Sequence, residues 1–309
     1  MPRATAEIVL HAPDRFDLRA TVLSHGYFEL APCRWRDGRR PVLVRAEALG
    51  PRRVYRLEIR PAPPRGVVLR ATGHDADEAE VLAPLAARVR TALRLDHDLR
   101  DFRRLCRSSP SLRPLARLGA GRILHGTTLF EDLVKAIAWT NTTWAGAVAT
   151  IARLGALGPP CPVDRTLRAF PSAAALARID ADELRLRTGL GYRARHVAAL
   201  ARDVEAGTRD LDALAAAVST LPRDTVVREL RTIAGVGPAT AGYVAAMLGR
   251  TDVPVVDRAT LRWMRAASGA STPEAVARRA ARWGRFAGLA LWWTQWLASR
   301  YPALLRARL

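Results

Sequence analysis

Residues 230–263, LRTIAGVGPATAGYVAAMLGRTDVPVVDRATLRW, hold the residue types and spacings best suited to chemistry. Gly235 and Gly237 are predicted to form a tight turn between two helices, with Pro238 at the first helical position, where a missing N–H is tolerated. Glycines allow close approach to the backbone, and a helix start offers free N–H groups, so the turn is suited to binding a phosphate. The alternative is an ordinary helix–helix turn.

Asp257 follows the apolar run VPVV, twenty residues after Gly237, at the start of another predicted helix. An aspartate at such a position usually caps the helix by accepting hydrogen bonds from backbone N–H groups. The same N–H groups and the helix dipole stabilise an ionised carboxylate, which a catalytic role would also require. Position alone therefore does not separate capping from catalysis.

In this segment the chain resembles the helix-hairpin-helix DNA glycosylase superfamily (HhH-GPD), which includes 3-methyladenine and 8-oxoguanine DNA glycosylases. The resemblance is carried by GVGPATA and VPVVD, together with TLFEDLVKAI (128–137), GLGYRARHV (189–197) and WGRFAGLALWW (283–293). It covers roughly residues 96–300 and, more loosely, the N-terminal part. It implies a hydrolase of base excision repair that flips a damaged base out of double-stranded DNA and hydrolyses its N-glycosidic bond.

The resemblance also implies the role of each site residue. Asp257 would be the catalytic residue, stabilising positive charge on the sugar and orienting the attacking water. Tyr192 would fill the gap left by the flipped base, Arg193 would reach the unpaired partner base, and Asn141 would lie beside that base.

The remaining contacts are expected at the hairpin and in the base pocket. The backbone of Gly235, Val236 and Gly237 would hold a DNA phosphate with the help of the Thr240 hydroxyl, and a structural Na⁺ or K⁺ is implied on the carbonyls of Arg231, Ile233 and Val236. Tyr243 lies one helical turn after Ala239 and faces the same way, so it would line the base pocket with Trp139 and Trp144, which flank Asn141.

The type of lesion is left open between two branches of the superfamily. Tyr192, Arg193 and Asn141 resemble the branch that acts on oxidised guanine, whereas Tyr243 and the aromatic content resemble the branch that acts on alkylated purines such as 3-methyladenine, which we favour. Bifunctional members carry a lysine where this chain has Ala239, so a Schiff-base lyase step lacks its nucleophile. We therefore expect a monofunctional glycosylase.

Other functions remain as alternatives. The chain would be a catalytically silent helix-hairpin-helix DNA-binding protein if Asp257 were only a cap, or a lyase if it used an unrecognised amine. The sole lysine, Lys135, lies on the helix leading to Asn141 and is expected to be a surface residue whose aliphatic stem covers apolar neighbours; the alternative is a contact in the cleft. The tryptophans of the last predicted helix (Trp283, Trp292, Trp293 and Trp296) are expected mostly in the core.

Composition supports a polyanionic partner and argues against several other classes. The 309 residues carry a formal net charge of +20, almost all of it from arginine. Three isolated cysteines without a CxxC pair argue against a zinc site or an iron–sulfur cluster, and no cofactor is expected to be required. No apolar run is long enough for a membrane span or a signal peptide, so we expect no membrane association and a cytoplasmic monomer, associated with the nucleoid in a bacterium.

These residues must be positioned by a mainly α fold with an N-terminal α+β domain. Residues 1–95 read as an antiparallel sheet with a hairpin connection at 62–66 and a helix at 78–93. Residues 96–309 read as an all-α helix-hairpin-helix domain, with two lobes flanking an active-site cleft. The run at 275–301 is predicted as one helix.

Overall fold

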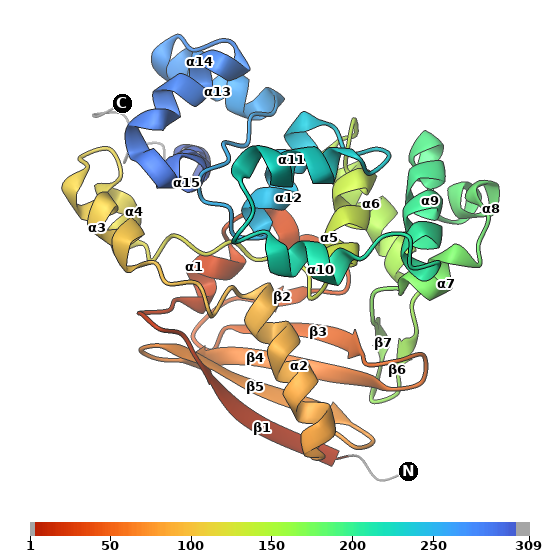
Figure 1. Ribbon diagram of the computed structural model, residues 1–309. Coiled ribbons are helices and arrows are strands. Elements are labelled where there is room, and N and C mark those ends of the chain that lie inside the picture. The colour runs from red at the N-terminus through yellow and green to blue at the C-terminus, as the bar shows by residue number, and fades with distance from the viewer. Residues whose placement is uncertain (1–3, 301–309) are drawn as a thin grey trace.

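A five-stranded antiparallel sheet forms the N-terminal part of the computed structural model, which describes residues 4–300 (Figure 1). The strand order is β1-β5-β4-β3-β2. The strands are β1 (Ala4–His11), β2 (Arg34–Arg36), β3 (Val42–Ala48), β4 (Val54–Ala62) and β5 (Gly66–Gly73). The predicted sheet and the connection at 62–66 are confirmed.

Both faces of this sheet are covered, because side chains alternate between the two faces of each strand. On one face Leu43 and Leu57 pack in the cluster that includes Val81 and Leu85 of helix α2 (Ala79–Ala92), which confirms the helix predicted at 78–93. On the other face lies a second cluster, formed by Val42, Val44, Ala46 and Val54 with Cys161, Leu167 and Ala169. This second cover is a hairpin of β6 (Pro160–Cys161) and β7 (Asp164–Arg168) that sequence analysis did not predict.

The rest of the described chain is largely helical. Two short helices, α1 (Leu18–Val22) and η1 (Gly26–Glu29), lie between β1 and β2. The later elements are α3 (Arg100–Ser108), α4 (Arg113–Arg117), α5 (Leu129–Ala138), α6 (Trp144–Gly155), α7 (Ala173–Ala177), α8 (Ala181–Thr188), η2 (Gly191–Arg193), α9 (Ala194–Glu205), α10 (Leu211–Ala217), α11 (Arg223–Arg231), α12 (Pro238–Met247), α13 (Arg258–Ser268), α14 (Pro273–Ala280), η3 (Ala281–Phe286) and α15 (Ala287–Arg300). The fold is mainly α with an N-terminal α+β part, as predicted.

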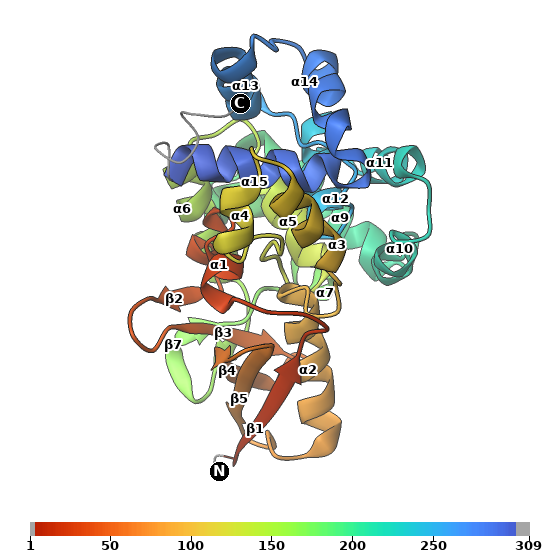
Figure 2. The same cartoon turned by 90° about the vertical axis from the view of Figure 1, so that its left-hand side faces the viewer.

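The helices form two groups. Helices α3 and α4 pack with α13, α14 and α15, and Phe102 of α3 meets Phe286 of η3 with ring centroids 5.5 Å apart. The second group contains α5 to α12, with α12 packed on both α5 and α11. Figures 1 and 2 show α15 running beside α4, with which it is in contact.

The helix predicted at 275–301 is wrong as a single element. Gly284 has φ +55° and ψ −133°, which breaks the run between α14 and α15, and Tyr301 lies outside the described residues. Only glycine adopts that backbone conformation at little cost, so Gly284 is the residue that allows the break.

The boundary predicted between residues 95 and 96 is crossed by the hydrophobic core. One cluster of buried residues runs from Leu10 to Leu297 and includes residues of the sheet and of both helix groups. The division into 1–95 and 96–309 therefore stays a prediction, and its ends include residues 1–3 and 301–309, outside the described range. Between residues 4 and 300, no helix is both long and apolar enough to span a bilayer.

Candidate active site

The predicted hairpin connects α11 to α12. Gly235 has φ +86°, a left-handed conformation, and Val236 donates its amide hydrogen to the carbonyl of Ile233 at 3.0 Å. Ile233 and Val236 are buried and anchor the turn, whereas Gly235 and Gly237 are exposed. The amides of the two glycines make no hydrogen bond within residues 4–300, so they are available to an external acceptor such as a phosphate oxygen.

Other hairpin residues are placed less favourably for DNA contact. Thr240 lies in the first turn of α12 and is only 8% exposed, so its side chain faces the protein. Ala239, by contrast, is exposed. The carbonyl of Ile233 already accepts the Val236 amide; as a carbonyl it retains a second lone pair, so the implied cation stays a prediction.

The predicted wedge lies in η2, just before α9. Tyr192 is 52% exposed, and its hydroxyl oxygen accepts a hydrogen bond from Asn141 Nδ2 at 3.0 Å. Its ring also meets the ring of His196 edge-on, at 6.2 Å between centroids. Because a Cβ on Gly235 would come within 3.0 Å of His196 Cβ, the wedge and the hairpin lie next to each other.

Arg193 is placed differently from its predicted role. Only 9% of the residue is exposed, and Nη1 donates to the carbonyl of Thr140 at 2.5 Å. Thr140 follows the end of α5, where unpaired carbonyls and the helix dipole attract a cation. The guanidinium is therefore held against the protein, and contact with a partner base would require it to leave this position.

Asp257 caps α13. Its Oδ1 accepts hydrogen bonds from the Thr260 backbone N at 2.7 Å and from the Thr260 hydroxyl at 2.9 Å. The residue is exposed, and Oδ2 accepts no hydrogen bond from residues 4–300. The cap and a free, solvent-facing carboxylate oxygen therefore coexist on one side chain.

The segment before Asp257 runs back along α12. A Cβ on Gly242 would lie 3.5 Å from the carbonyl oxygen of Pro254, so the two backbones are in close contact. Burial raises the pKa of Tyr243 well above its ordinary value, and the negative charges of Asp132 and Asp257 raise it further. The catalytic candidate and the pocket candidate are thus electrostatic neighbours.

Tyr243 is the centre of an aromatic cluster with Trp139, Trp292 and His25. Its ring centroid lies 4.6 Å from that of Trp139, 5.2 Å from Trp292 and 5.8 Å from His25. All four side chains are half-buried. Trp144 lies at the edge of the cluster, 42% exposed and 6.4 Å from Trp139, with Nε1 donating to Glu29 at 2.9 Å.

Two members of this cluster, Trp292 and His25, were not predicted from the sequence. Trp292 was expected in the core, but it lies against Tyr243 and His25; its neighbour Trp293 is fully buried, as expected. His25 comes from the loop before η1, more than two hundred residues from Tyr243 in the chain, and no local pattern marks it.

The protonation of His25 follows from its two partners. Nε2 lies 2.6 Å from the carbonyl oxygen of Leu124, which can only accept, so Nε2 carries the hydrogen. Burial lowers the pKa of His25 to about 4, so Nδ1 is unprotonated at neutral pH and accepts from the Tyr243 hydroxyl at 2.8 Å. The phenol hydroxyl is therefore fixed in one orientation.

The expected surface position of Lys135 is wrong. The side chain is 0% exposed, Nζ lies 2.6 Å from Glu131 Oε1, and it sits 4.2 Å from the ring centroid of Tyr27. Glu131, one helical turn earlier on α5, supplies the charge that makes this burial tolerable. The chain's single lysine is thus enclosed in the protein.

Comparison with solved structures places this arrangement in a known fold. MBOgg1 in complex with a low-affinity DNA ligand matches with a TM-score of 0.75 at 19% identity, covering 98% of this chain and 100% of that chain. The 3-methyladenine DNA glycosylase of Archaeoglobus fulgidus gives 0.75 at 21% identity, covering 95% and 99%. The 8-oxoguanine glycosylase/lyase of Clostridium acetobutylicum, bound to duplex DNA with cytosine opposite 8-oxoguanine, gives 0.69 at 15% identity, covering 96% and 98%.

Comparison of the sequence alone finds no matching family model and no matching curated protein. The likeness at these identities is one of fold, and it extends over nearly the whole of each chain. The predicted fold, a mainly α helix-hairpin-helix structure behind an antiparallel sheet, is confirmed.

Proposed function

We propose that the protein is a monofunctional DNA glycosylase that flips a damaged base from duplex DNA and hydrolyses its N-glycosidic bond. The observation that carries this proposal is Asp257, an exposed carboxylate with one unengaged oxygen. Its partner Thr260 lies 2.8 Å from Gln295, one turn after Trp292 of the aromatic cluster on α15. The carboxylate would stabilise the oxocarbenium-like transition state, and the rings would receive the extruded base. The exposed hairpin amides would hold the DNA backbone.

Alkylated purines such as 3-methyladenine are the substrate class that we favour. Several alkylated bases are cationic, and a cation binds the faces of electron-rich rings such as those of Trp139, Tyr243 and Trp292. His25 adds no opposing charge, because burial holds its pKa at about 4. Water rather than a lysine is the expected nucleophile, since Ala239 occupies the lysine position and Lys135 is enclosed.

One observation favours oxidised guanine as a second candidate class. Asn141 and Tyr192 form a hydrogen-bonded pair on the exposed surface, and the resemblance assigns this pair to the oxidised-guanine branch. A panel of duplexes, each with one alkylated or oxidised base, separates the two classes by which base is released.

Asp257→Asn tests the mechanism on that panel. The amide keeps an oxygen that can cap α13 but loses the negative charge, so we expect base release to fall at least about 100-fold, while thermal stability changes little. Sodium borohydride should trap no covalent protein–DNA adduct. Equal activity of the variant would remove Asp257 from the mechanism, efficient trapping would contradict monofunctional chemistry, and binding without any base release would favour a silent DNA-binding protein.

A further inference from the structure

A second candidate binding site lies on α3, apart from the hairpin and the wedge. It is a hollow of about 480 Å³ lined by Arg15, Arg65, Arg100, Arg103, Arg104 and Arg107. Asp14 is its one carboxylate. We call this hollow the arginine pocket. In Figure 1, α3 lies at the left of the molecule, whereas α9, which follows the wedge, lies at the right.

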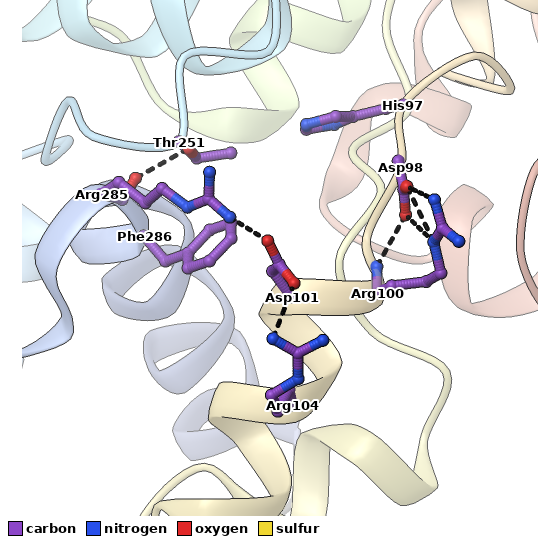
Figure 3. Close-up of a pocket in the computed structure, with 8 residues that line it drawn as sticks. All are labelled: His97, Asp98, Arg100, Asp101, Arg104, Thr251, Arg285 and Phe286. Atoms are coloured by element: carbon purple, nitrogen blue, oxygen red, sulfur yellow. Dashed lines mark hydrogen bonds and ion pairs between the residues drawn. The ribbon is translucent and has the colours of Figure 1, made fainter.

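Nearby acids neutralise only half of these arginines. Figure 3 shows the adjoining hollow, of about 550 Å³, which shares Arg100 and Arg104 with the arginine pocket. There Asp98 pairs with Arg100, and Asp101 pairs with Arg104 at 3.1 Å and also with Arg285. On the other side Asp14 pairs with Arg103 at 2.9 Å and with Arg122.

The other three arginines have no such partner. Arg15, Arg65 and Arg107 are exposed, and between residues 4 and 300 their guanidinium groups form neither an ion pair nor a hydrogen bond. They face the same hollow as Arg103, whose pKa is lowered first by burial and then, against the opposing effect of Asp14, by the positive charges of Arg122, Arg15 and Arg107. Like charges therefore converge on this hollow, and an anion in it would relieve their repulsion.

The chemistry of the lining indicates which anion. A guanidinium binds two oxygens of a phosphate at once, and several such forks around one hollow suit a phosphodiester backbone. A surface that binds a membrane usually adds large apolar side chains to its cations, but Pro13 is the only apolar residue in this lining. The lining therefore favours nucleic acid over a lipid surface.

We propose that the arginine pocket binds the phosphate backbone of a second DNA segment, separate from the segment held at the hairpin. The choice of DNA among polyanions rests on the proposed function. A protein that holds two segments at once would bridge duplexes, which would keep it on DNA while it searches for lesions.

The test measures bridging of two undamaged duplexes, one carrying a donor and the other an acceptor fluorophore. The triple variant Arg15→Gln, Arg65→Gln, Arg107→Gln should lose the energy transfer that the wild type produces. For the same variant, the slope of log DNA affinity against log salt concentration should be shallower than that of the wild type by about 2 to 3. Each phosphate contact contributes about 0.9 to this slope, and the variant removes three arginines. Base release from a damaged duplex should stay unchanged.

A matched control removes the same charge elsewhere. Arg39, Arg40 and Arg52 are exposed loop residues of the sheet and form no ion pair within the described range, so their triple glutamine variant should bridge like the wild type. Thermal melting of both variants checks folding. The proposal is overturned if the wild type does not bridge, if the pocket variant still bridges, or if both variants lose bridging equally, which would indicate net charge alone.

Two further outcomes distinguish DNA bridging from membrane binding and from the proposed glycosylase function. Loss of binding to phosphatidylserine vesicles by the pocket variant, with DNA bridging intact, would assign the pocket to a membrane and overturn the proposal. Bridging that depends on the pocket, in a protein that releases no base from any lesion, would support the pocket while contradicting the glycosylase function.

Discussion

At the scale of single residues, the contact between His25 and Tyr243 decides the character of the aromatic cluster. Leu124 fixes the imidazole hydrogen on Nε2, so Nδ1 holds the phenol hydroxyl and the imidazole stays neutral above about pH 4. The cluster therefore carries no positive charge at neutral pH. A cationic base stacked on these rings would be attracted more strongly than a neutral one.

Variants of Tyr243 test whether the aromatic cluster prefers a cationic base. Tyr243→Ala removes the central ring, and we expect release of a cationic alkylated base to fall about 10- to 100-fold, because stacking on an aromatic ring contributes about 1–3 kcal/mol per base. Tyr243→Phe keeps the ring and loses the hydrogen bond to His25, so base release should stay within about 5-fold of the wild type while the folded state loses about 1 kcal/mol of stability. Single-turnover rates on a cationic and a neutral lesion provide the measurement. Equal losses on both lesions in Tyr243→Ala would show that positive charge is not what the cluster recognises.

At the scale of elements, the hairpin between α11 and α12 is fixed by two glycines with different tasks. Gly235 needs its left-handed backbone, and a Cβ there would press on His196. Gly237 has φ −81°, and a Cβ there would meet nothing within 4 Å. The turn itself requires a glycine only at position 235. We therefore infer that the missing side chain at Gly237 leaves space for an external ligand.

Alanine at each glycine separates these two tasks. Gly235→Ala should destabilise the fold by about 1–2 kcal/mol, because an alanine resists the left-handed conformation. Gly237→Ala should leave the unfolding free energy nearly unchanged but weaken DNA binding, because its methyl group occupies the space that a phosphate would approach. Urea unfolding and binding to undamaged duplex are the two measurements. Full DNA affinity in Gly237→Ala would exclude a phosphate at this part of the turn.

The same elements show which features of the fold and the site could be predicted from the sequence and which could not. The hairpin, the start of α12 at Pro238 and the cap at Asp257 follow from local rules for glycine, proline and aspartate, and all were predicted. His25 and Trp292 were missed because they join the cluster through tertiary packing alone. Lys135 was misplaced because its local partner Glu131, one turn earlier on α5, does not show whether the pair is buried. The ring of Tyr27, which encloses it, comes from η1 through tertiary packing. Local preferences thus locate turns and caps but not contacts between distant segments.

At the scale of the whole molecule, a buried ionic network joins the sheet to the helices. Arg45 on β3 pairs with Glu47 at 2.8 Å and with Glu131 on α5 at 2.9 Å, while Lys135 pairs with Glu131 at 2.6 Å. Burial alone would raise the pKa of Glu131, but the charges of Arg45 and Lys135 outweigh it and lower this pKa below 4.5. Lys135 of this network contacts the ring of Tyr27, and Tyr27 in turn contacts His25 of the aromatic cluster. The sheet therefore helps to position the aromatic cluster.

Because the pKa of Glu131 is lower in the folded state than in the unfolded state, its contribution to stability is present above about pH 4.5 and is lost as the pH falls below that value. Glu131→Gln should lower the free energy of unfolding by about 3–5 kcal/mol at pH 7, since Arg45 and Lys135 remain buried with one acid fewer. It should also weaken the dependence of stability on pH at acidic pH.

Glu183→Gln is the matched control: Glu183 also pairs with a residue four positions later, Arg187, but both side chains are about half exposed. That change should cost at most about 1 kcal/mol. Urea unfolding of both variants from pH 3 to pH 7 decides the matter, and similar losses would mean that the enclosed network contributes no more than a surface ion pair.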